Sequence, residues 1–286
     1  MKPAAFEYRA PGSVAEALDM LGSEHGDGEA KILAGGQSLV PLMNFRLARP
    51  PVLIDVNRLA ELDYLREDGG WLACGALTRQ RMVERSALVA EHCSILAEAT
   101  RWIGHTTIRN RGTVGGSLAH NDPTAEYALL AVLLEAEVVL RSSSGTRVVP
   151  AAEFLGPYMT TALRPDELLT EVRWPVLPAG TRWAFQEFAR RHGDFGIVAV
   201  AAVVLDGAVR VAVAGAGPVP FRATVAEAAL ARGRLTGKAI GAAAEVAAEG
   251  AQPESDIHAS AEYRRHLTRV LTRRALEQLA GSEWAQ

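Results

Sequence analysis

The sequence predicts an α+β protein of 286 residues, built from three consecutive units that span residues 1–57, 58–176 and 177–286. In the first two units, short strand patterns alternate with helix patterns and turn signals. In the third unit, an antiparallel meander precedes a group of helices. A hydrophobic content of 49% at this chain length is enough for several separate cores. We therefore expect two α+β units followed by a smaller C-terminal α+β domain with an antiparallel sheet.

The first unit opens with a helix whose start is marked by a capping box. Ser13 and Glu16 have the spacing at which two side chains satisfy the first free amides of a helix, which here is expected to run to Leu21. A loop rich in Gly and Asp follows at 22–28. The remaining expected elements are a strand at 31–34, a helix from 38 to 47 that tolerates Pro41 in its first turn, and a strand at 52–56.

The second unit is expected to hold two hairpins, at 63–75 and 138–149, with helices between them. Thr78 is placed as the cap of one helix, and residues 88–102 carry the apolar spacing of another. The pair Asp122-Pro123 is interpreted as an N-cap followed by proline at the first helical position. The buried stripe of that helix is formed by Leu129, Leu130, Leu133 and Leu134.

The third unit begins after Pro175 and Pro178, which mark a linker. Strands are expected at 183–189, 198–205 and 208–214, and the Asp-Gly pair between the last two fits a two-residue turn. Helices are expected at about 222–232, 237–249 and 260–279.

Charge and composition restrict the classes of partner. A net charge of −3 and a pI near 6.2 argue against nucleic acid or an acidic membrane surface. The longest apolar run, 196–205, is about ten residues, too short to span a bilayer. The first ten residues lack the apolar core of a signal peptide, so a cytoplasmic protein is expected.

The chain has only two cysteines, Cys74 and Cys93, so no disulfide framework is expected. Any iron–sulfur cluster, which takes about four thiolates, would lie on another chain.

Two glycine-rich stretches are the main candidates for ligand binding. Glycine lacks a Cβ, so a ligand can approach the backbone closely and consecutive amides can point at one anion. Two such loops on different units could hold the two phosphates of a dinucleotide from both sides. The alternative is a pair of tight turns, since paired glycines commonly mark turns. Neither stretch matches a Rossmann or a phosphate-loop pattern. The residues are Ala34, Gly35, Gly36, Gln37 and Ser38, and Thr113, Val114, Gly115, Gly116 and Ser117.

Other patterns have simpler explanations. His120, Asp122 and Glu126 could ligate a metal, but no second well-spaced set of ligands accompanies them. A serine hydrolase would need a Gly-x-Ser-x-Gly elbow, which the sequence lacks. Glu126 suits the first turn of a helix with or without a ligand. The basic run from Arg264 to Arg274 is interpreted as a solvated helix face rather than a docking site.

Both glycine-rich stretches belong to longer motifs that resemble a known family. Residues 34–50, AlaGlyGlyGlnSerLeuValProLeuMetAsnPheArgLeuAlaArgPro, look like the first flavin loop of the FAD-binding medium subunits of molybdenum hydroxylases, the carbon monoxide dehydrogenase and xanthine dehydrogenase type. Residues 107–126 look like the second flavin loop, and residues 190–198 are similar to the segment near the flavin ring. The resemblance runs nearly end to end. It implies an FAD-binding fold of the vanillyl-alcohol-oxidase/p-cresol-methylhydroxylase type, with FAD between the first two units.

The resemblance also implies roles for individual residues. The pyrophosphate of FAD would lie against 34–38 and 113–117. Glu126 matches an acidic residue that contacts the cofactor, Phe195 matches the position near the isoalloxazine, and Leu163 falls in a stretch that lines this ring. No catalytic residue for substrate chemistry and no metal ligand is expected in this chain.

The implied function is electron transfer within a multi-subunit enzyme, since FAD does the redox work and no acid–base pair for substrate chemistry stands out. A molybdenum cofactor on a large subunit would oxidise the substrate, and [2Fe–2S] clusters on a small subunit would pass electrons to this FAD. Xanthine dehydrogenases have a lysine where Ile197 aligns, so the chain departs from that branch and NAD as acceptor is in doubt. The alternatives are a stand-alone flavin oxidoreductase of the same fold and a non-catalytic nucleotide-binding module.

Overall fold

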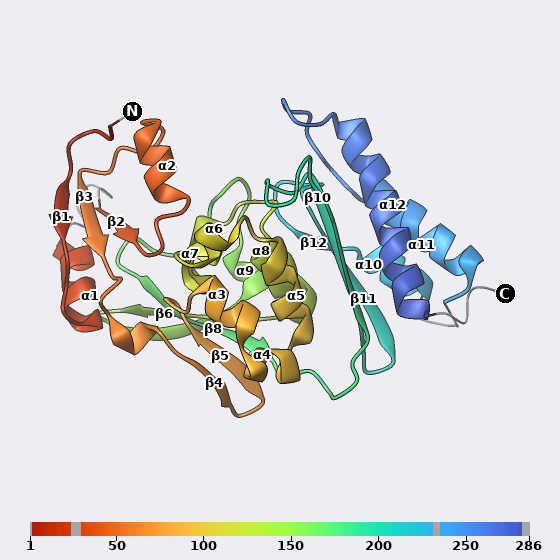
Figure 1. The fold of residues 1–286 in the computed structure, drawn as a ribbon, viewed down its shortest axis with the longest axis horizontal. Helices are drawn as coiled ribbons and strands as arrows, with labels where there is room; N and C mark the ends of the chain where they lie inside the picture. The colour runs from red at the N-terminus through yellow and green to blue at the C-terminus, as the bar shows by residue number, and fades with distance from the viewer. Residues whose placement is uncertain (1, 24–29, 231–234, 282–286) are drawn as a thin grey trace.

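In the part of the chain that the structure describes, three β-sheets follow one another in sequence order (Figure 1). The computed structural model describes residues 2–23, 30–230 and 235–281. Most of the loop expected at 22–28 therefore lies outside the described residues. The expected α+β class, with an antiparallel sheet in the C-terminal domain, is confirmed.

The first sheet is parallel, with the strand order β1-β3-β2. Helix α1 (Val14–Ser23) covers it and buries residues at helical spacing, from Val14 to Leu21. The expected capping residue is confirmed, because Ser13 Oγ accepts a hydrogen bond from the amide of Glu16. Strand β1 was not expected from the sequence. The strands are β1 (Glu7–Arg9), β2 (Ala30–Leu33) and β3 (Val52–Asp55), and the short helix α2 (Leu39–Asn44) follows β2.

The second sheet is antiparallel, with the order β4-β5-β8-β6-β7. Both expected hairpins are confirmed. The central strand β8 was missed, because its first five residues are all buried and the sequence there does not alternate as a half-exposed strand would. The strands are β4 (Leu65–Asp68), β5 (Trp71–Gly75), β6 (Glu137–Ser142), β7 (Gly145–Pro150) and β8 (Leu168–Pro175).

Several helix boundaries of the second unit differ from expectation. The helix expected at 88–102 is broken at Cys93, whose φ of −155° and ψ of 63° are not helical. Thr78 is not a cap: its hydroxyl donates to the carbonyl oxygen of Tyr64. The helical elements are η1 (Ala60–Leu62), α3 (Gln80–Arg85), α4 (Ala87–His92), α5 (Ser94–Trp102), α6 (Thr106–Arg109), α7 (Val114–His120), α8 (Glu126–Leu134) and α9 (Ala151–Phe154).

Helix α8 is buried on all sides rather than along one stripe. The four leucines expected in its core are buried, and so are the other residues from Tyr127 to Leu134. The cause is its position, since it packs against both the second and the third sheet (Figure 1). A helix that is apolar all round is expected in such a place.

The third sheet is antiparallel, with the order β12-β11-β10-β9, and is covered on both faces. Along β10, Ala199, Ala201 and Val203 face the core around α5 and α8, while the residues between them face the core under α11 and α12. Positive φ angles of 52° at Asp206 and 75° at Gly207 confirm the two-residue turn. The elements are β9 (Trp183–Phe188), β10 (Val198–Leu205), β11 (Ala208–Ala214), β12 (Phe221–Arg222), α10 (Thr224–Leu230), α11 (Gly237–Glu249) and α12 (Ala261–Ala280).

The helices expected in the third unit are confirmed, although residues 231 and 232 of the first lie outside the description. Across the described ranges, no helix combines the length and the apolarity that a membrane crossing requires.

Candidate cofactor-binding site

The stretch 34–38 connects strand β2 to helix α2 and presents a run of free backbone amides. The N–H groups of residues 35–39 make no hydrogen bond to any residue that the structure describes. Gly36 adopts a φ of +72°, which side chains with a Cβ rarely tolerate. Consecutive free amides beside a left-handed glycine form a concave donor surface suited to an anion. This stretch is therefore the candidate phosphate-binding segment of the chain.

The two glycine-rich stretches lie against each other, as expected. A Cβ added to Gly35 would collide with the carbonyl oxygen of Arg111 and would lie 2.9 Å from the Cα of Gly112. A Cβ added to Gly116 would lie 3.5 Å from the Cβ of Ala34. The first stretch follows a strand of the first sheet and the second opens α7, so the contact joins the first and second units (Figure 1).

The second stretch is not the amide-lined loop that the sequence suggested. Thr113 is the N-cap of α7, and its Oγ1 accepts from the amide of Gly116 at 3.1 Å. The amides of Val114, Gly115 and Ser117 are bonded to backbone carbonyl oxygens. A Cβ on Gly115 would lie 2.6 Å from the Cβ of Ala76, so this glycine is required for packing. The free amides of the site therefore come from the first stretch.

Two polar residues that sequence reasoning missed connect the stretches. Arg79 donates from Nη1 to the carbonyl oxygen of Arg111 at 2.7 Å and from Nη2 to Oδ1 of Asn57 at 2.8 Å. Asn57 in turn donates from Nδ2 to the carbonyl oxygen of Ala34 at 2.6 Å. The available signal was positional: β2 and β3 are parallel, so polar residues just after β3 lie at the same sheet edge as the stretch after β2.

Glu126 begins α8, and the residue before it, Ala125, is the N-cap. The expectation that Asp122-Pro123 opens this helix is wrong. Asp122 Oδ1 instead accepts from the amide and the hydroxyl of Thr124, at 2.8 and 2.7 Å, which fixes a turn ahead of the helix. Burial raises the pKa of Glu126, and the charge of Asp122 raises it further.

A second carboxyl group, Glu187 on β9, faces Glu126 across the boundary with the third sheet. Burial, followed by the charge of Glu126, raises the pKa of Glu187 well above the usual carboxyl range. Its Oε2 is buried without a hydrogen-bond partner among the described residues, and its side chain packs beside Gly196. Each of the two carboxyls is therefore more readily protonated than an exposed one. Nothing in the sequence pattern of β9 distinguished Glu187.

Leu163 and Phe195 lie in other segments, and neither makes a hydrogen bond or ring contact with the glycine-rich stretches in the described structure. Leu163 packs at the edge of the core around α8. Phe195 is 75% exposed in the segment between β9 and β10, two residues before the buried Ile197. An apolar ring so exposed is suited to cover a bound planar group.

His120 ends α7, and burial lowers its pKa. Within the described ranges, no three His, Cys, Asp or Glu side chains come together as a potential metal site.

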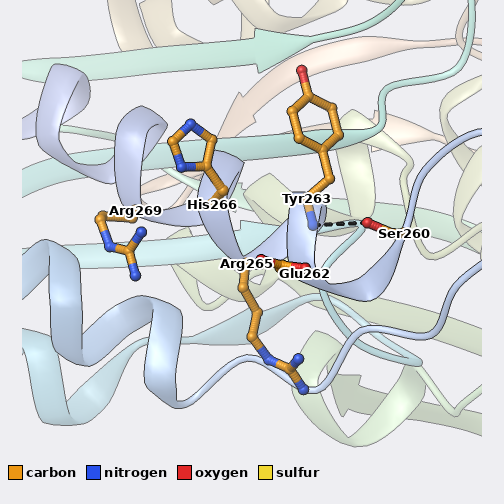
Figure 2. A pocket seen from close by; sticks show the side chains of 6 residues that line it. All are labelled: Ser260, Glu262, Tyr263, Arg265, His266 and Arg269. Carbon is orange, nitrogen blue, oxygen red and sulfur yellow. Dashed lines mark hydrogen bonds between the residues drawn. The ribbon is translucent and has the colours of Figure 1, made fainter.

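A surface hollow of about 470 Å³ lies elsewhere, along α12. Figure 2 shows the side chains that line it, none of which belongs to the glycine-rich stretches: Ser260, Glu262, Tyr263, Arg265, His266 and Arg269. Arg264 departs from the expected solvated face. It is 7% exposed and donates to the carbonyl oxygens of Ile197 and Gly215 and to Asp256.

The α+β fold, the free amides and the glycine contacts together define a nucleotide-cofactor-binding protein. Residues 4–177 match the family described as the FAD-binding domain in molybdopterin dehydrogenase, and residues 183–279 match the CO dehydrogenase flavoprotein C-terminal domain. The chain belongs to the family of FAD-binding medium subunits of molybdenum hydroxylases. Its cofactor is FAD, and it is an oxidoreductase subunit.

Individual relatives agree along the whole chain. The alpha subunit of the 6-hydroxypseudooxynicotine dehydrogenase complex of Paenarthrobacter nicotinovorans is 43% identical, over 96% of this chain and 95% of that protein. The carbon monoxide dehydrogenase medium chain of Hydrogenophaga pseudoflava is 37% identical, over 100% of this chain and 99% of that protein. A solved carbon monoxide dehydrogenase from that organism superposes with a TM-score of 0.93 at 38% identity, covering 98% of each chain. The solved structure of quinoline 2-oxidoreductase from Pseudomonas putida 86 superposes with a TM-score of 0.92 at 37% identity, also covering 98% of each chain.

Proposed function

We propose that this chain is the electron-transfer subunit of a molybdenum hydroxylase. It would take electrons from [2Fe–2S] clusters on a small partner subunit and pass them to a terminal acceptor, while a large partner subunit would carry the molybdenum cofactor. The names of the relatives support this assembly, since they describe medium chains and subunits of complexes. Only two cysteines, both buried, are present in the chain, which is consistent with clusters on another subunit.

The observation that carries the proposal is the run of free amides at 35–39 against the second glycine-rich stretch. We assign the pyrophosphate of FAD to Ala34, Gly35, Gly36, Gln37 and Ser38. The opposite wall would be formed by Thr113, Val114, Gly115, Gly116 and Ser117. Gly116 would contribute most, because it lets this wall lie close to the first stretch. We assign the units to residues 1–57, 58–176 and 177–286, with FAD between the first two.

FAD, when bound, supplies the redox chemistry of this subunit, and the protein supplies binding, orientation and electrostatics. The amides of the first stretch bind and orient the phosphates. Glu126 would contact the cofactor, Leu163 would line the isoalloxazine, and Phe195 would cover it and exclude water. Glu126 and Glu187, whose pKa values are both raised, would share a proton beside Gly196, next to the Phe195 that is proposed to cover the isoalloxazine.

Two further assignments complete the proposal. Position 197 carries an isoleucine and not the lysine of the xanthine dehydrogenase branch. Ile197 is buried, and its carbonyl oxygen accepts a hydrogen bond from Arg264. We therefore favour a terminal acceptor other than NAD. The buried free thiols of Cys74 and Cys93 suit a reducing compartment, and we place the protein in the cytoplasm.

Anaerobic flavin reduction tests the proposed role. The chain is purified alone and together with the proposed [2Fe–2S] and molybdenum subunits, and its flavin absorbance is followed after addition of substrate or NAD(P)H. We expect rapid bleaching by substrate only in the complex. Rapid bleaching of the isolated chain would instead identify a stand-alone oxidoreductase, and a bound cofactor that no partner reduces would identify a nucleotide-binding module.

A further inference from the structure

Asn57 and Arg79 form a polar bridge between the two halves of the cofactor site. Asn57 follows β3 of the first sheet, and Arg79 directly precedes α3 of the second unit. Asn57 Nδ2 donates to the carbonyl oxygen of Ala34, Arg79 Nη2 donates to Asn57 Oδ1, and Arg79 Nη1 donates to the carbonyl oxygen of Arg111. The chain of bonds thus begins in the first glycine-rich stretch and ends just before the second.

Arg79 is bound by neutral oxygens rather than by a carboxylate. Burial lowers its pKa and the charge of Arg111 lowers it further, while the charges of Asp63 and Asp55 act in the opposite direction. Its guanidinium makes these two hydrogen bonds from two separate nitrogens, Nη1 and Nη2, held in a fixed planar fork, whereas a lysine would have a single nitrogen to reach both acceptors. The backbone beside it is tied to the same segment, because Arg79 and Thr113 form an isolated β-bridge.

Asn57 is itself fixed by neighbours. Asp55 Oδ1 accepts from both the amide and Nδ2 of Asn57, at 2.9 and 2.6 Å, and Tyr8 donates to the other oxygen of Asp55 at 2.6 Å. These bonds leave Asn57 Oδ1 directed at Arg79. The network therefore holds the backbone oxygens on both sides of the site at a set separation.

We propose that Asn57 and Arg79 are positioning residues for the pyrophosphate of FAD, which hold the amides of residues 35–39 against the opposite wall formed by residues 113–117. The inference rests on the proposed assignment of the pyrophosphate to these stretches. Neither side chain needs to touch the cofactor, because Asn57 bonds to the carbonyl oxygen of Ala34 in the first stretch and Arg79 to that of Arg111, just before the second. Their loss should weaken ligands that carry a diphosphate and leave a ligand without phosphate unaffected.

The test compares Arg79→Met, Asn57→Ala and the double variant with the unchanged full-length chain. Arg101→Met is the matched control, because Arg101 is exposed and pairs only one helical turn away, with Glu98. Dissociation constants are measured for FAD, ADP and riboflavin after removal of bound flavin. We expect FAD and ADP to bind at least tenfold more weakly to each single variant, with riboflavin unchanged. The double variant should bind FAD no more weakly than the single variant with the lower FAD affinity, since both residues belong to one network.

Equal FAD affinity in Arg79→Met and the unchanged chain would overturn the proposal, and so would an equal loss for riboflavin, which indicates general damage. If the unchanged chain binds neither FAD nor ADP, the proposed function fails as well, and this outcome is distinct from the others.

Hydrogen exchange decides the case in which Arg79→Met does not fold or riboflavin binds too weakly to measure. The amides of Val40 and Val56 bond to the carbonyl oxygens of Gly36 and Leu33 and so report on the first stretch. In flavin-free Arg79→Lys and Asn57→Ala we expect both amides to exchange faster, with exchange in α12 unchanged. Unchanged exchange at Val40 and Val56 would overturn the proposal.

Discussion

Gly35 packs so closely on the carbonyl oxygen of Arg111 that a single added methyl group would collide with it. The contact joins the stretch after β2 to the segment that leads into α7. Because the partner is backbone, the clash cannot be relieved by rotating a side chain. Under the proposed assignment of the pyrophosphate, the affinity for FAD and the fit between the first two units would depend on the same glycine.

Gly35→Ala should abolish or strongly weaken FAD binding and lower the free energy of unfolding by about 1–3 kcal/mol, the usual cost of forcing an extra carbon into a packed site. Flavin content after purification and urea unfolding measure the two effects. Gly22→Ala is the control, because nothing lies within 4 Å of an added Cβ there and the residue is helical. Normal flavin content in Gly35→Ala would contradict the assignment.

Arg264→Met should destabilise the C-terminal domain by about 2 kcal/mol or more, because it leaves the buried carbonyl oxygens of Ile197 and Gly215 without their donor. Urea unfolding of the full-length chain measures the loss. Arg265→Met, at an exposed neighbouring position on α12, should change stability little. Equal effects of the two substitutions would show that Arg264 is not the anchor that its burial implies.

Glu187→Gln should make stability less dependent on pH. The pKa of Glu187 rises from an ordinary value of 4.5 to about 9 in the folded protein, mainly through burial. The folded state therefore binds the proton more tightly, and this contribution is complete below about pH 4.5 and is lost as pH rises toward 9. The variant should melt at a higher temperature than the parent at pH 8.5, by an amount that shrinks toward pH 5.

Thermal melting across this pH range checks the prediction, with the exposed Glu91→Gln as the control. A pH profile of Glu187→Gln that parallels the parent would show that Glu187 is already ionised in the folded state.

Cys74 and Cys93 should not react with thiol reagents while the chain is folded. Both side chains are fully buried, and burial raises the pKa of each thiol, that of Cys93 to about 12. A chromogenic disulfide reagent should label both only after denaturant is added. Rapid labelling under native conditions would mean that the core around α4 and α5 opens readily.

Local patterns allowed much of this fold to be predicted. The Ser13 cap of α1, the two hairpins, and the Asp-Gly turn between β10 and β11 each depend on residues close in sequence, and each is confirmed. The first glycine-rich stretch was also recognisable, because its two glycines lie between a strand pattern and a helix pattern.

Features that depend on distant contacts were beyond the sequence. Strand β8 lies at the centre of its sheet, and its first five residues, all buried, do not alternate, so the strand was recognised only from its pairing with β5 and β6. The second glycine-rich stretch became a helix start because Thr113 caps it and Ala76 packs on it. Arg264 looked like its exposed neighbours, and only the fold shows which arginine of α12 points inward.

The identity of the flavin that the purified chain releases on denaturation tests the central claim most directly. FAD carries the pyrophosphate that the amides of residues 35–39 are assigned to bind, whereas FMN does not. We predict a yellow protein that releases stoichiometric FAD and no FMN. A chain that holds no flavin even after incubation with FAD, or that retains FMN instead, would contradict the account.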